Sequence, residues 1–520
     1  METNTLNTQY AGKNLIKVTT AADFAAGELT GLIPANVGSG ALTLAEGALE
    51  GRFVSAAYLL QDFRTMTASW NASIPRGSTV ETLARVWDAA ANAWGEWQSW
   101  GEYGMAMLRH SMKDGITAPP DEFDRPEWEH GGTVKAQFSA ILRRNDAQAP
   151  APVLRQLTYS IKGTKEAPIP ATYAEEAPAS IPLKALTPAP AYAQGNRHPD
   201  IGHSICSPTT ITVQLNGRDP GLDINHEALA LSAGFDFGYG WGNWAFSTAA
   251  AGLYGYEAYT QYGDLNILLS ELANGRSVGL SVRYNKDPES EYYLENAYNN
   301  TGGHLFTVIG YEYRDENGMP DEAKRPENLY FYSSDSYAPN DAASVHLYRW
   351  THLDKCWPGR AMYIVSAKPV AGAAVTGVEE IAAALAPAGE NAYALMAEGV
   401  KVDLTNFTED KKAVSGRGIF AYTVEGLRTD AATPTFTETY KGVDYENRVW
   451  VTANDTFFYS GFATSEDGSI LFDAANALYA AGIPEGETRA LTIYAITNDG
   501  RMYCAPLTAT SHKGDEKSAQ

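Results

Sequence analysis

A segment dense in proline and alanine, APIPATYAEEAPASIPLKALTPAPAYA, lies about a third of the way along this chain of 520 residues. Proline has a fixed φ and no backbone N–H donor, so such a segment resists helix and sheet and tends to run extended along a surface. We therefore predict a linker over 166–192 that follows an N-terminal domain over 1–165. Hydrophobic residues make up 44% of the sequence, which is enough for a core on each side of the linker.

The N-terminal region carries the period-2 pattern of β-strands. Apolar and polar residues alternate in five segments: RFVSAAYLL, TMTASWNASI, STVETLARVW, AQFSAILRR and PVLRQLTYSI. These segments predict a β-sandwich of about eight strands. Residues 1–50 are rich in Gly, Ala and Thr with weak periodicity, and we interpret them as an extended arm or a pair of edge strands.

Five of the eleven tryptophans fall within one short window of this region: Trp70, Trp87, Trp94, Trp97 and Trp100. They are interpreted as the core and rim of the sandwich. The alternative is an aromatic platform that binds a glycan or a peptide, because exposed rings on a rigid sheet bind flat apolar faces.

The texture of the sequence changes after the linker. Residues 193–368 predict a mixed α/β domain with a helix that begins at Cys206, a second helix near DLNILLSELANG and three strands at the end. Residues 369–520 predict a C-terminal β-sandwich domain from RGIFAYTVEG, RVWVTAND, GSILFDAANAL and RALTIYAITNDGRMY. The Asn-Asp-Gly at 498–500 is a hairpin signal. The fold class is α+β.

Charge and hydropathy exclude several classes of partner. Acidic residues outnumber basic residues 62 to 39, for a net charge of −23 and a pI near 4.8. This balance, without any basic run, excludes nucleic acid as the main partner and opposes an anionic membrane surface. The sequence contains no apolar stretch of transmembrane length and no signal peptide in METNTLNTQYAGKNLIKV. We expect a cytoplasmic protein without a membrane span, and export by another route stays open.

The three cysteines, Cys206, Cys356 and Cys504, are too few and too widely spaced for a disulfide framework. Cys206 precedes Ser-Pro-Thr-Thr, and Pro208 suits the first turn of a helix. We predict a helix beginning at Cys206, although the β-branched run TTITV has a low helix propensity. Unpaired N–H groups and the positive end of the helix dipole would stabilise the nucleophilic thiolate there.

A predicted hairpin lies about 100 residues further on. His304 follows Gly302-Gly303 and opens the strand GGHLFTVIGYEY, and the strand NLYFYSSD ends in Asp335. The polar segment between them is centred near residue 320, so antiparallel pairing places position 304 opposite 335 or 336. We expect Asp335 to accept a hydrogen bond from one imidazole nitrogen of His304 and leave the other to take a proton from a thiol.

Other side chains near Cys206 offer competing interpretations. His198 and His203 could act as bases or, with the cysteine, as zinc ligands, but the short C-x-x-C spacing typical of zinc sites is absent from the sequence. We predict no metal and no other cofactor. The segment GYGWGNW lacks the spacing of a dinucleotide-binding loop. We interpret it as a loop beside a cleft, in which Trp241 and Trp244 either line a substrate groove with Gly303 or serve packing.

The order Cys206-Ser-Pro-Thr-Thr, Gly302-Gly303-His304 and Asp335 resembles the C39-like cysteine peptidases of the papain-like superfamily. The resemblance covers about 190–366 and implies a papain-like fold with the Cys at the head of the central helix. It also implies that Gln194 and the Cys206 N–H form the oxyanion hole. The segments SWNASIPRGSTVETLARVW and GEWQSWGEYG look like the β-sandwich that often precedes this domain in long bacterial members. The family's Asp usually stands in an Asn-Asp-Pro setting, whereas this chain has Ser334-Asp335-Ser336, which leaves Asp341 as an alternative.

We therefore predict a papain-like cysteine peptidase domain flanked by two β-sandwich domains. The expected activity is hydrolysis of a peptide or amide bond by Cys206, His304 and Asp335 through an acyl-enzyme. One alternative is a catalytically idle papain-like domain whose sandwiches bind a glycan or peptide. The other is an acyltransferase that uses the same triad.

Overall fold

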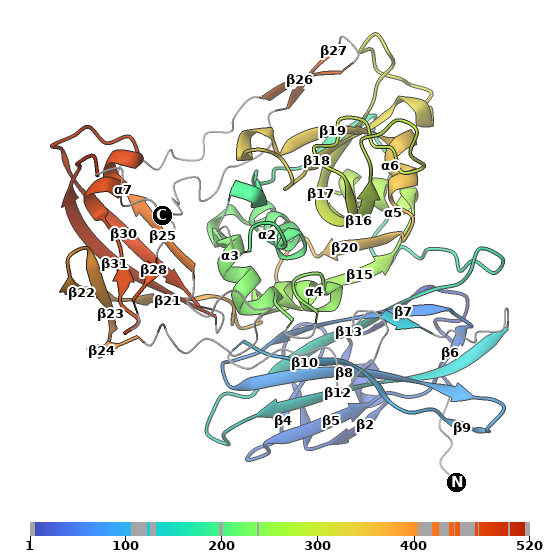
Figure 1. Cartoon of the computed structure of the whole chain (residues 1–520). Helices are drawn as coiled ribbons and strands as arrows, with labels where there is room; N and C mark the ends of the chain where they lie inside the picture. Colours follow the sequence, from blue (N-terminus) through green and yellow to red (C-terminus); the bar gives the residue numbers. More distant parts are fainter. Residues whose placement is uncertain are drawn as a thin grey trace.

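The computed structural model describes residues 6–105, 122–124, 132–196, 201–236, 239–402, 404, 419–425, 436–440, 443–447, 463–465, 467–497 and 500–514 (Figure 1). They form a mixed α/β structure in which strands outnumber helices and assemble into several sheets. This arrangement is compatible with the predicted β-rich regions on either side of a mixed region. The division of the chain at 165, 192 and 368 stays a prediction.

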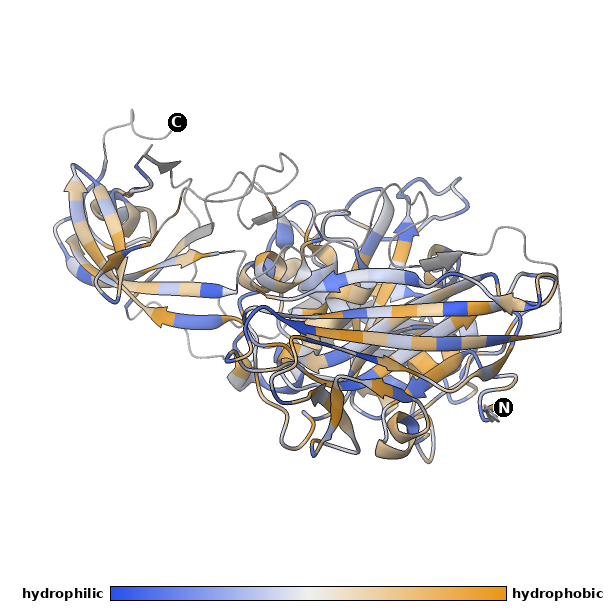
Figure 2. Ribbon diagram, turned by 90° about the horizontal axis from the view of Figure 1, so that it is seen from below, coloured by the Kyte–Doolittle hydropathy of each residue, from blue (hydrophilic) through white to orange (hydrophobic). Residues whose placement is uncertain are grey.

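The N-terminal region is built from two antiparallel sheets that pack against each other. One sheet has the order β11-β7-β13-β4-β3, with β1 on β13, and the other has the order β10-β8-β12-β5-β2, with β6 on β12 and β9 on β8. The strands are β1 (Leu15–Val18), β2 (Glu28–Thr30), β3 (Leu32–Ala35), β4 (Ala41–Leu44), β5 (Glu50–Val54), β6 (Tyr58–Gln61), β7 (Thr65–Ser73), β8 (Ser78–Asp88), β9 (Ala93–Trp94), β10 (Gln98–Tyr103), β11 (Glu122–Asp124), β12 (Thr133–Arg144) and β13 (Val153–Lys162). Trp70, Phe138 and Tyr159 are buried in the shared core. Figure 2 shows apolar and polar residues alternating along the long strands, as the period-2 pattern predicts.

Residues 6–50 are more integrated into the sheets than the sequence indicates. β2 and β3 are edge strands, as predicted. The prediction of an extended arm is wrong, because β1 and β4 both pair with β13 and the helix α1 (Ala21–Ala25) lies between β1 and β2. The pattern was weak because these strands are short.

The middle region contains a seven-stranded sheet of order β15-β20-β16-β17-β18-β19, with β14 on β17. Its strands are β14 (Lys184–Leu186), β15 (Ala258–Tyr262), β16 (Val278–Tyr284), β17 (Thr301–Tyr313), β18 (Leu329–Ser334), β19 (Val345–Arg349) and β20 (Ala361–Val365), and its helices are α2 (Cys206–Arg218), α3 (His226–Leu229), α4 (Trp244–Leu253), α5 (Leu265–Ala273) and α6 (Trp350–Cys356). The helices predicted at Cys206 and in DLNILLSELANG are confirmed as α2 and α5. The sequence predicted three strands at the end of this region, where the structure has the four strands β17 to β20.

The Pro/Ala-rich segment forms part of this sheet. Lys184–Leu186 pair with Gly310–Glu312 of β17 in an antiparallel register. The prediction that the segment resists sheet is therefore wrong at this point, where Pro182 and Pro188 flank the paired residues and leave their N–H groups free to bond.

Polar side chains join the N-terminal sandwich to the middle sheet. The backbone N–H groups of β15 at Ala258, Thr260 and Tyr262 donate to side chains of the sandwich, namely Asn71 Oδ1, Ser69 Oγ and Ser160 Oγ, at 3.0, 2.9 and 3.0 Å. β15 is an edge strand, so these bonds satisfy donors that would otherwise be open to pairing with another chain.

The buried Arg155 links the same two regions. Its guanidinium donates to Ser73 Oγ at 2.8 Å and to the carbonyl of Gly252 in the last turn of α4 at 2.7 Å. Burial lowers the pKa of Arg155 to about 10. The cation lies at the negative end of the α4 dipole, which is the favourable end for a positive charge.

The C-terminal region contains sheets of order β21-β31-β30-β25 and β22-β23-β29-β28, with β24 on β23, and a separate β26-β27 pair. Its elements are β21 (Glu379–Ala382), β22 (Ala384–Gly389), β23 (Ala392–Ala397), β24 (Val400–Lys401), β25 (Ile419–Val424), β26 (Phe436–Tyr440), β27 (Val443–Asn447), β28 (Ala463–Thr464), β29 (Ile470–Leu471), α7 (Ala474–Ala480), β30 (Thr488–Ile496) and β31 (Arg501–Thr510). The prediction of a strand throughout GSILFDAANAL is wrong, because Asp473 caps α7 by accepting from Asn476 N. RVWVTAND and residues 498–499 lie outside the described residues.

A hydrophobic cluster connects the C-terminal sheet to the middle region. Ile496 and Met502 pack with Ile201, Ile205 and Trp241, and all five are buried. We call this group the junction cluster. It includes the residue that directly precedes Cys206 in the chain.

None of the helices in the described parts of the chain has the length and apolar character that crossing a membrane requires.

Candidate active site

Cys206 is the first residue of α2. The preceding residue, Ile205, provides no side-chain cap, so no side chain of the N-cap competes for the N–H groups of the first turn. The β-branched run that follows is helical in spite of its propensity, because Ser207–Asn216 are all buried against β17, α3 and α4. Tertiary packing thus decides the local structure that places the cysteine.

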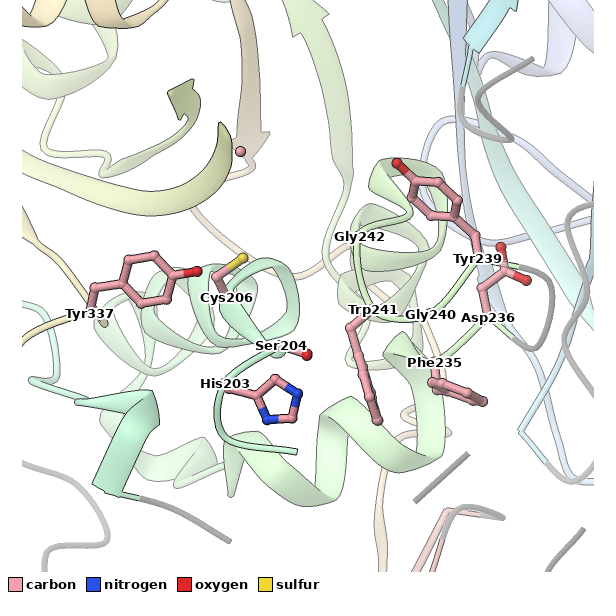
Figure 3. Close-up of a pocket in the computed structure, with 11 residues that line it drawn as sticks. His203, Ser204, Cys206, Phe235, Asp236, Tyr239, Gly240, Trp241, Gly242 and Tyr337 are labelled. Atoms are coloured by element: carbon pink, nitrogen blue, oxygen red, sulfur yellow. The ribbon is translucent and has the colours of Figure 1, made fainter. Parts of the chain in front are cut away.

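Two cavities meet at Cys206. The smaller, of about 470 Å³, is lined by residues that include His203, Trp241 and Tyr337, and the larger, of about 540 Å³, by residues that include Trp244 and Leu305. Both cavities share four lining residues: Cys206, Tyr239, Gly242 and Gly303. Figure 3 shows Cys206 and Tyr337 on one side of the smaller cavity and Trp241 and Tyr239 on the other. Cys206 is therefore accessible from two directions.

His304 and Asp335 form a buried pair. His304 Nε2 lies 2.8 Å from Asp335 Oδ1, and the two residues are 1% and 0% exposed. The other ring nitrogen, Nδ1, is buried and has no oxygen or nitrogen partner among the described residues, while His304 interacts with the thiol of Cys206. With Nε2 held by the carboxylate, Nδ1 is the nitrogen that remains to exchange a proton with Cys206.

The hairpin carrying this pair has a different register from the predicted one. β17 and β18 are antiparallel, as expected, but the pairs are Thr307 with Ser334 and Val308 with Ser333. Extended towards residue 304, this register places Tyr337 opposite His304 instead of residue 335 or 336. The loop is asymmetric and a bulge follows Val308, which explains the offset. His304 and Asp335 meet through their side chains beyond the end of β18.

Asp335 is held by several donors. Tyr348 Oη donates to Oδ2 at 2.6 Å, Tyr284 Oη lies 3.5 Å from the same oxygen, and the backbone N–H of Tyr337 donates to Oδ1 at 2.9 Å. The alternative carboxylate, Asp341, instead accepts from the backbone N–H of Ala193 at 2.6 Å. The structure therefore brings Asp335, and not Asp341, to His304.

Tyr337 covers the imidazole of His304. The two rings are parallel, with centroids 3.8 Å apart and an interplanar angle of 7°. An aromatic face stabilises a cationic ring stacked on it and keeps water from the His304–Asp335 hydrogen bond. Sequence reasoning missed Tyr337, and its only signal was an aromatic residue two positions after Asp335.

Each pKa shift in this group favours the charged form of its side chain. Burial alone would raise the pKa of the Cys206 thiol, but the hydrogen bond and charge of His304, with backbone hydrogen bonds of Leu305 and Ser207, lower it below its usual value. Burial opposes the charged form of His304, yet Asp335 raises its pKa to about 9. The pKa of Asp335 is lowered in spite of burial by His304 and Tyr348. These shifts favour a thiolate beside an imidazolium.

Gln194 lies beside this group in the short helix η1 (Gln194–Asn196) and is fully buried. Its Oε1 accepts from Ser336 Oγ at 2.5 Å, and its backbone N–H donates to the Ser336 carbonyl at 2.8 Å. The Nε2 amide has no hydrogen-bond partner among the described residues. An amide that is fixed by its oxygen and has an unused N–H can donate to a developing negative oxygen.

The other residues singled out from the sequence have clear positions. Trp241 lines the smaller cavity and its Nε1 donates to the Ala230 carbonyl at 3.2 Å, while Trp244 lines the larger cavity at the start of α4. Gly303 lines both cavities, and a Cβ added there would meet no atom within 4 Å. His203 is exposed in the smaller cavity, and His198 lies outside the described residues. Their roles in binding substrate stay predictions.

The tryptophan window of the sandwich divides into two groups. Trp70 and Trp100 are buried in the core. Trp87, Trp94 and Trp97 are partly exposed, and each faces a cation at 4.5 to 5.1 Å: Arg85 lies over Trp94 and Trp97, Arg52 over Trp97 and Lys135 over Trp87. A role for these three rings in binding a glycan or peptide stays a prediction. Within the described residues, no group of His, Cys, Asp and Glu is arranged to hold a metal ion.

Comparison with known proteins bears on the middle region. Residues 187–363 match the model of the Peptidase_C39 like family, whereas no curated protein matches the chain. The matched segment contains Gln194, Cys206, His304 and Asp335. The resemblance predicted from the sequence is thus confirmed over residues 187–363, which are similar to the Peptidase_C39 like family and support a cysteine-peptidase-like function for this chain.

Proposed function

We propose that this chain is a papain-like cysteine peptidase or amidase in which Cys206, His304 and Asp335 act as a triad. The observation that carries the proposal is the buried His304–Asp335 pair, 2.8 Å apart, next to a partly exposed cysteine at the start of a helix. A nucleophile, a base and a group that orients the base are the minimal set for covalent acyl transfer.

In the first half of the reaction, the Cys206 thiolate attacks the carbonyl carbon of the substrate. The new C–S bond forms as the carbonyl electrons move to oxygen, which accepts hydrogen bonds from Gln194 Nε2 and the Cys206 N–H. The intermediate collapses, the C–N bond breaks and His304 Nδ1 delivers its proton to the leaving amine. The product is an acyl-enzyme on Cys206 with neutral His304.

In the second half, His304 takes a proton from water and the resulting hydroxide attacks the acyl carbon. The C–S bond then breaks, the acid product leaves and the thiolate–imidazolium pair is restored. Asp335 keeps Nε2 as the donor of its hydrogen bond throughout, so Nδ1 always faces the reacting atoms. Tyr337 stays stacked on the ring and limits its rotation.

The direct test is site-resolved alkylation. Intact protein is treated with limiting iodoacetamide near pH 6.5 and adducts are mapped at all three cysteines, while hydrolysis of a mixture of peptides is followed by mass spectrometry. We expect Cys206 to react at least about tenfold faster than an unfolded thiol, and peptide hydrolysis to disappear in proportion to its modification. The proposal fails if Cys206 reacts no faster than that reference, or if fully alkylated protein still hydrolyses peptides.

A further inference from the structure

Arg283 lines the larger cavity beside Cys206. It is the penultimate residue of β16, and its side chain is exposed. Among the described residues that line this cavity, Arg283 is the only Lys or Arg and there is no Asp or Glu; the wall also includes Trp244, Val282 and Leu305. An exposed cation on this wall stands out in a chain with a net charge of −23.

The position of this guanidinium is fixed. It lies 3.9 Å from the ring centroid of Tyr292 and donates a hydrogen bond to the Tyr292 hydroxyl. Tyr292 is itself anchored, because its carbonyl accepts from Asn285 N at 2.9 Å and from Cys356 Sγ at 3.2 Å. A side chain that is stacked and anchored in this way has already lost much of its conformational entropy before any ligand binds.

The charge of Arg283 is not neutralised by a neighbour. Among the described residues no carboxylate lies within ion-pair distance of Arg283, whereas Arg276 pairs with Glu271 at 2.7 Å and Arg314 with Glu312. An arginine without a counter-ion in a cleft can bind a carboxylate ligand through two charge-assisted hydrogen bonds.

We propose that the larger cavity binds a carboxylate of the substrate through Arg283. This inference rests on the proposed peptidase function and names its substrate class: peptides with an acidic group on the side of the scissile bond that occupies this cavity. The carboxylate belongs either to an Asp or Glu side chain or to a free C-terminus. The planar guanidinium accepts both in the same bidentate geometry.

The first test uses peptides in matched sets. Each set varies one position near the scissile bond among Glu, Gln and Lys, and each peptide is made with a free and an amidated C-terminus. We expect the wild-type protein to prefer Glu over Gln, or free acid over amide, by about tenfold or more in kcat/KM. In Arg283→Met this ratio falls towards one, and in Arg283→Glu the preference turns to Lys. Arg349→Met is the control, since Arg349 also lies over a tyrosine ring but lines neither cavity.

The second test needs no knowledge of the peptide. Cys206 is alkylated with iodoacetate, an anion, and with the neutral iodoacetamide, and the ratio of the two rates is compared between variants. We expect the iodoacetate to iodoacetamide ratio to fall about threefold or more in Arg283→Met and to stay at the wild-type value in Arg349→Met.

The outcomes separate this inference from the proposed function. If Cys206 is hyperreactive and peptides are hydrolysed, but both ratios are the same in wild type and Arg283→Met, the carboxylate site is refuted while the peptidase stands. If Cys206 reacts no faster than an unfolded thiol, the proposed function fails and the inference fails with it. A charge preference that survives in Arg283→Met also overturns the assignment.

Discussion

Cys206 begins the helix α2, whereas Cys356 ends the helix α6. Cys206 is partly exposed. Burial alone would raise the pKa of its thiol, but His304 and backbone hydrogen bonds lower it below its usual value. Cys356 is fully buried, donates to the Tyr292 carbonyl at 3.2 Å, and burial raises its pKa to about 12. One thiol accepts hydrogen bonds and the other donates one.

The difference shows that the pKa of a cysteine thiol depends on its position in the fold. A helix N-terminus presents unpaired N–H groups and positive charge, which favour the thiolate, while a helix C-terminus presents carbonyls, which favour the protonated thiol. In the proposed mechanism the same amino acid therefore serves as a nucleophile at one site and as a small buried donor at the other.

Replacing each of the two cysteines with alanine tests this contrast most strongly. We expect Cys206→Ala to lower peptide hydrolysis by at least about 1,000-fold, since the nucleophile of a triad is removed. We expect Cys356→Ala to keep the rate within about twofold and to lower only the melting temperature, because a packed side chain is shortened. Steady-state kinetics and thermal melts measure both. Equal loss of activity in the two variants would remove the distinction.

Removing the amide of Gln194 tests whether the site stabilises an oxyanion as well as a thiolate. We expect Gln194→Ala to reduce kcat/KM by about 100- to 1,000-fold, the effect of losing one donor to the oxyanion. Alkylation of Cys206 by iodoacetamide passes through no oxyanion, so its rate is expected to stay within about threefold of wild type. If alkylation falls as much as hydrolysis, Gln194 supports the position of the thiolate instead.

The pH profile distinguishes the two thiols through His304. We expect the Cys206 alkylation rate to stay high below pH 8, because its pKa is lowered, and that of Cys356 to be negligible there. Hydrolysis also needs protonated His304, so it is expected to fall about tenfold per pH unit above the His304 pKa of about 9 while alkylation persists. His304→Gln is expected to reduce Cys206 alkylation at pH 6 by about tenfold. Parallel profiles for alkylation and hydrolysis above pH 9 would contradict this assignment.

The smallest expected effect concerns the tyrosine that holds Asp335. Tyr348→Phe removes a donor to the carboxylate, so the pKa of Asp335 rises and the acid limb of the activity profile moves to higher pH by less than about one unit. The plateau of kcat/KM is expected to fall several-fold. Tyr332→Phe is the matched control, because Tyr332 donates to Glu312 at 2.7 Å on a neighbouring strand of the same sheet. The same shift in both variants would assign the effect to general destabilisation.

The sequence predicted the helix start and the hairpin of the site better than it predicted the pairing of the two strands. Cys206 at a helix start and an antiparallel hairpin after His304 both follow from local signals: Pro208 in the first turn and a polar loop between two alternating runs. The register could not be predicted, because it depends on a bulge after Val308 that no local pattern indicates.

The residues that hold the site were out of reach for a different reason. Tyr284, Tyr348 and Tyr337 come from β16, β19 and the loop after β18, and only the folded sheet brings them to His304 and Asp335. The same holds for Ser336, whose hydroxyl donates to the side-chain oxygen of Gln194. A single sequence contains no local pattern that identifies residues which come into contact only in the folded protein.

The junction cluster contains residues that are translated at very different times during protein synthesis. Ile205 directly precedes Cys206, yet two members of its hydrophobic cluster, Ile496 and Met502, are translated about 300 residues later, a delay of at least about 15 seconds at usual ribosome speeds. The His304–Asp335 hairpin is complete well before that moment. The hydrophobic cluster around the turn that leads into Cys206 is therefore complete only after residue 502 has been synthesised.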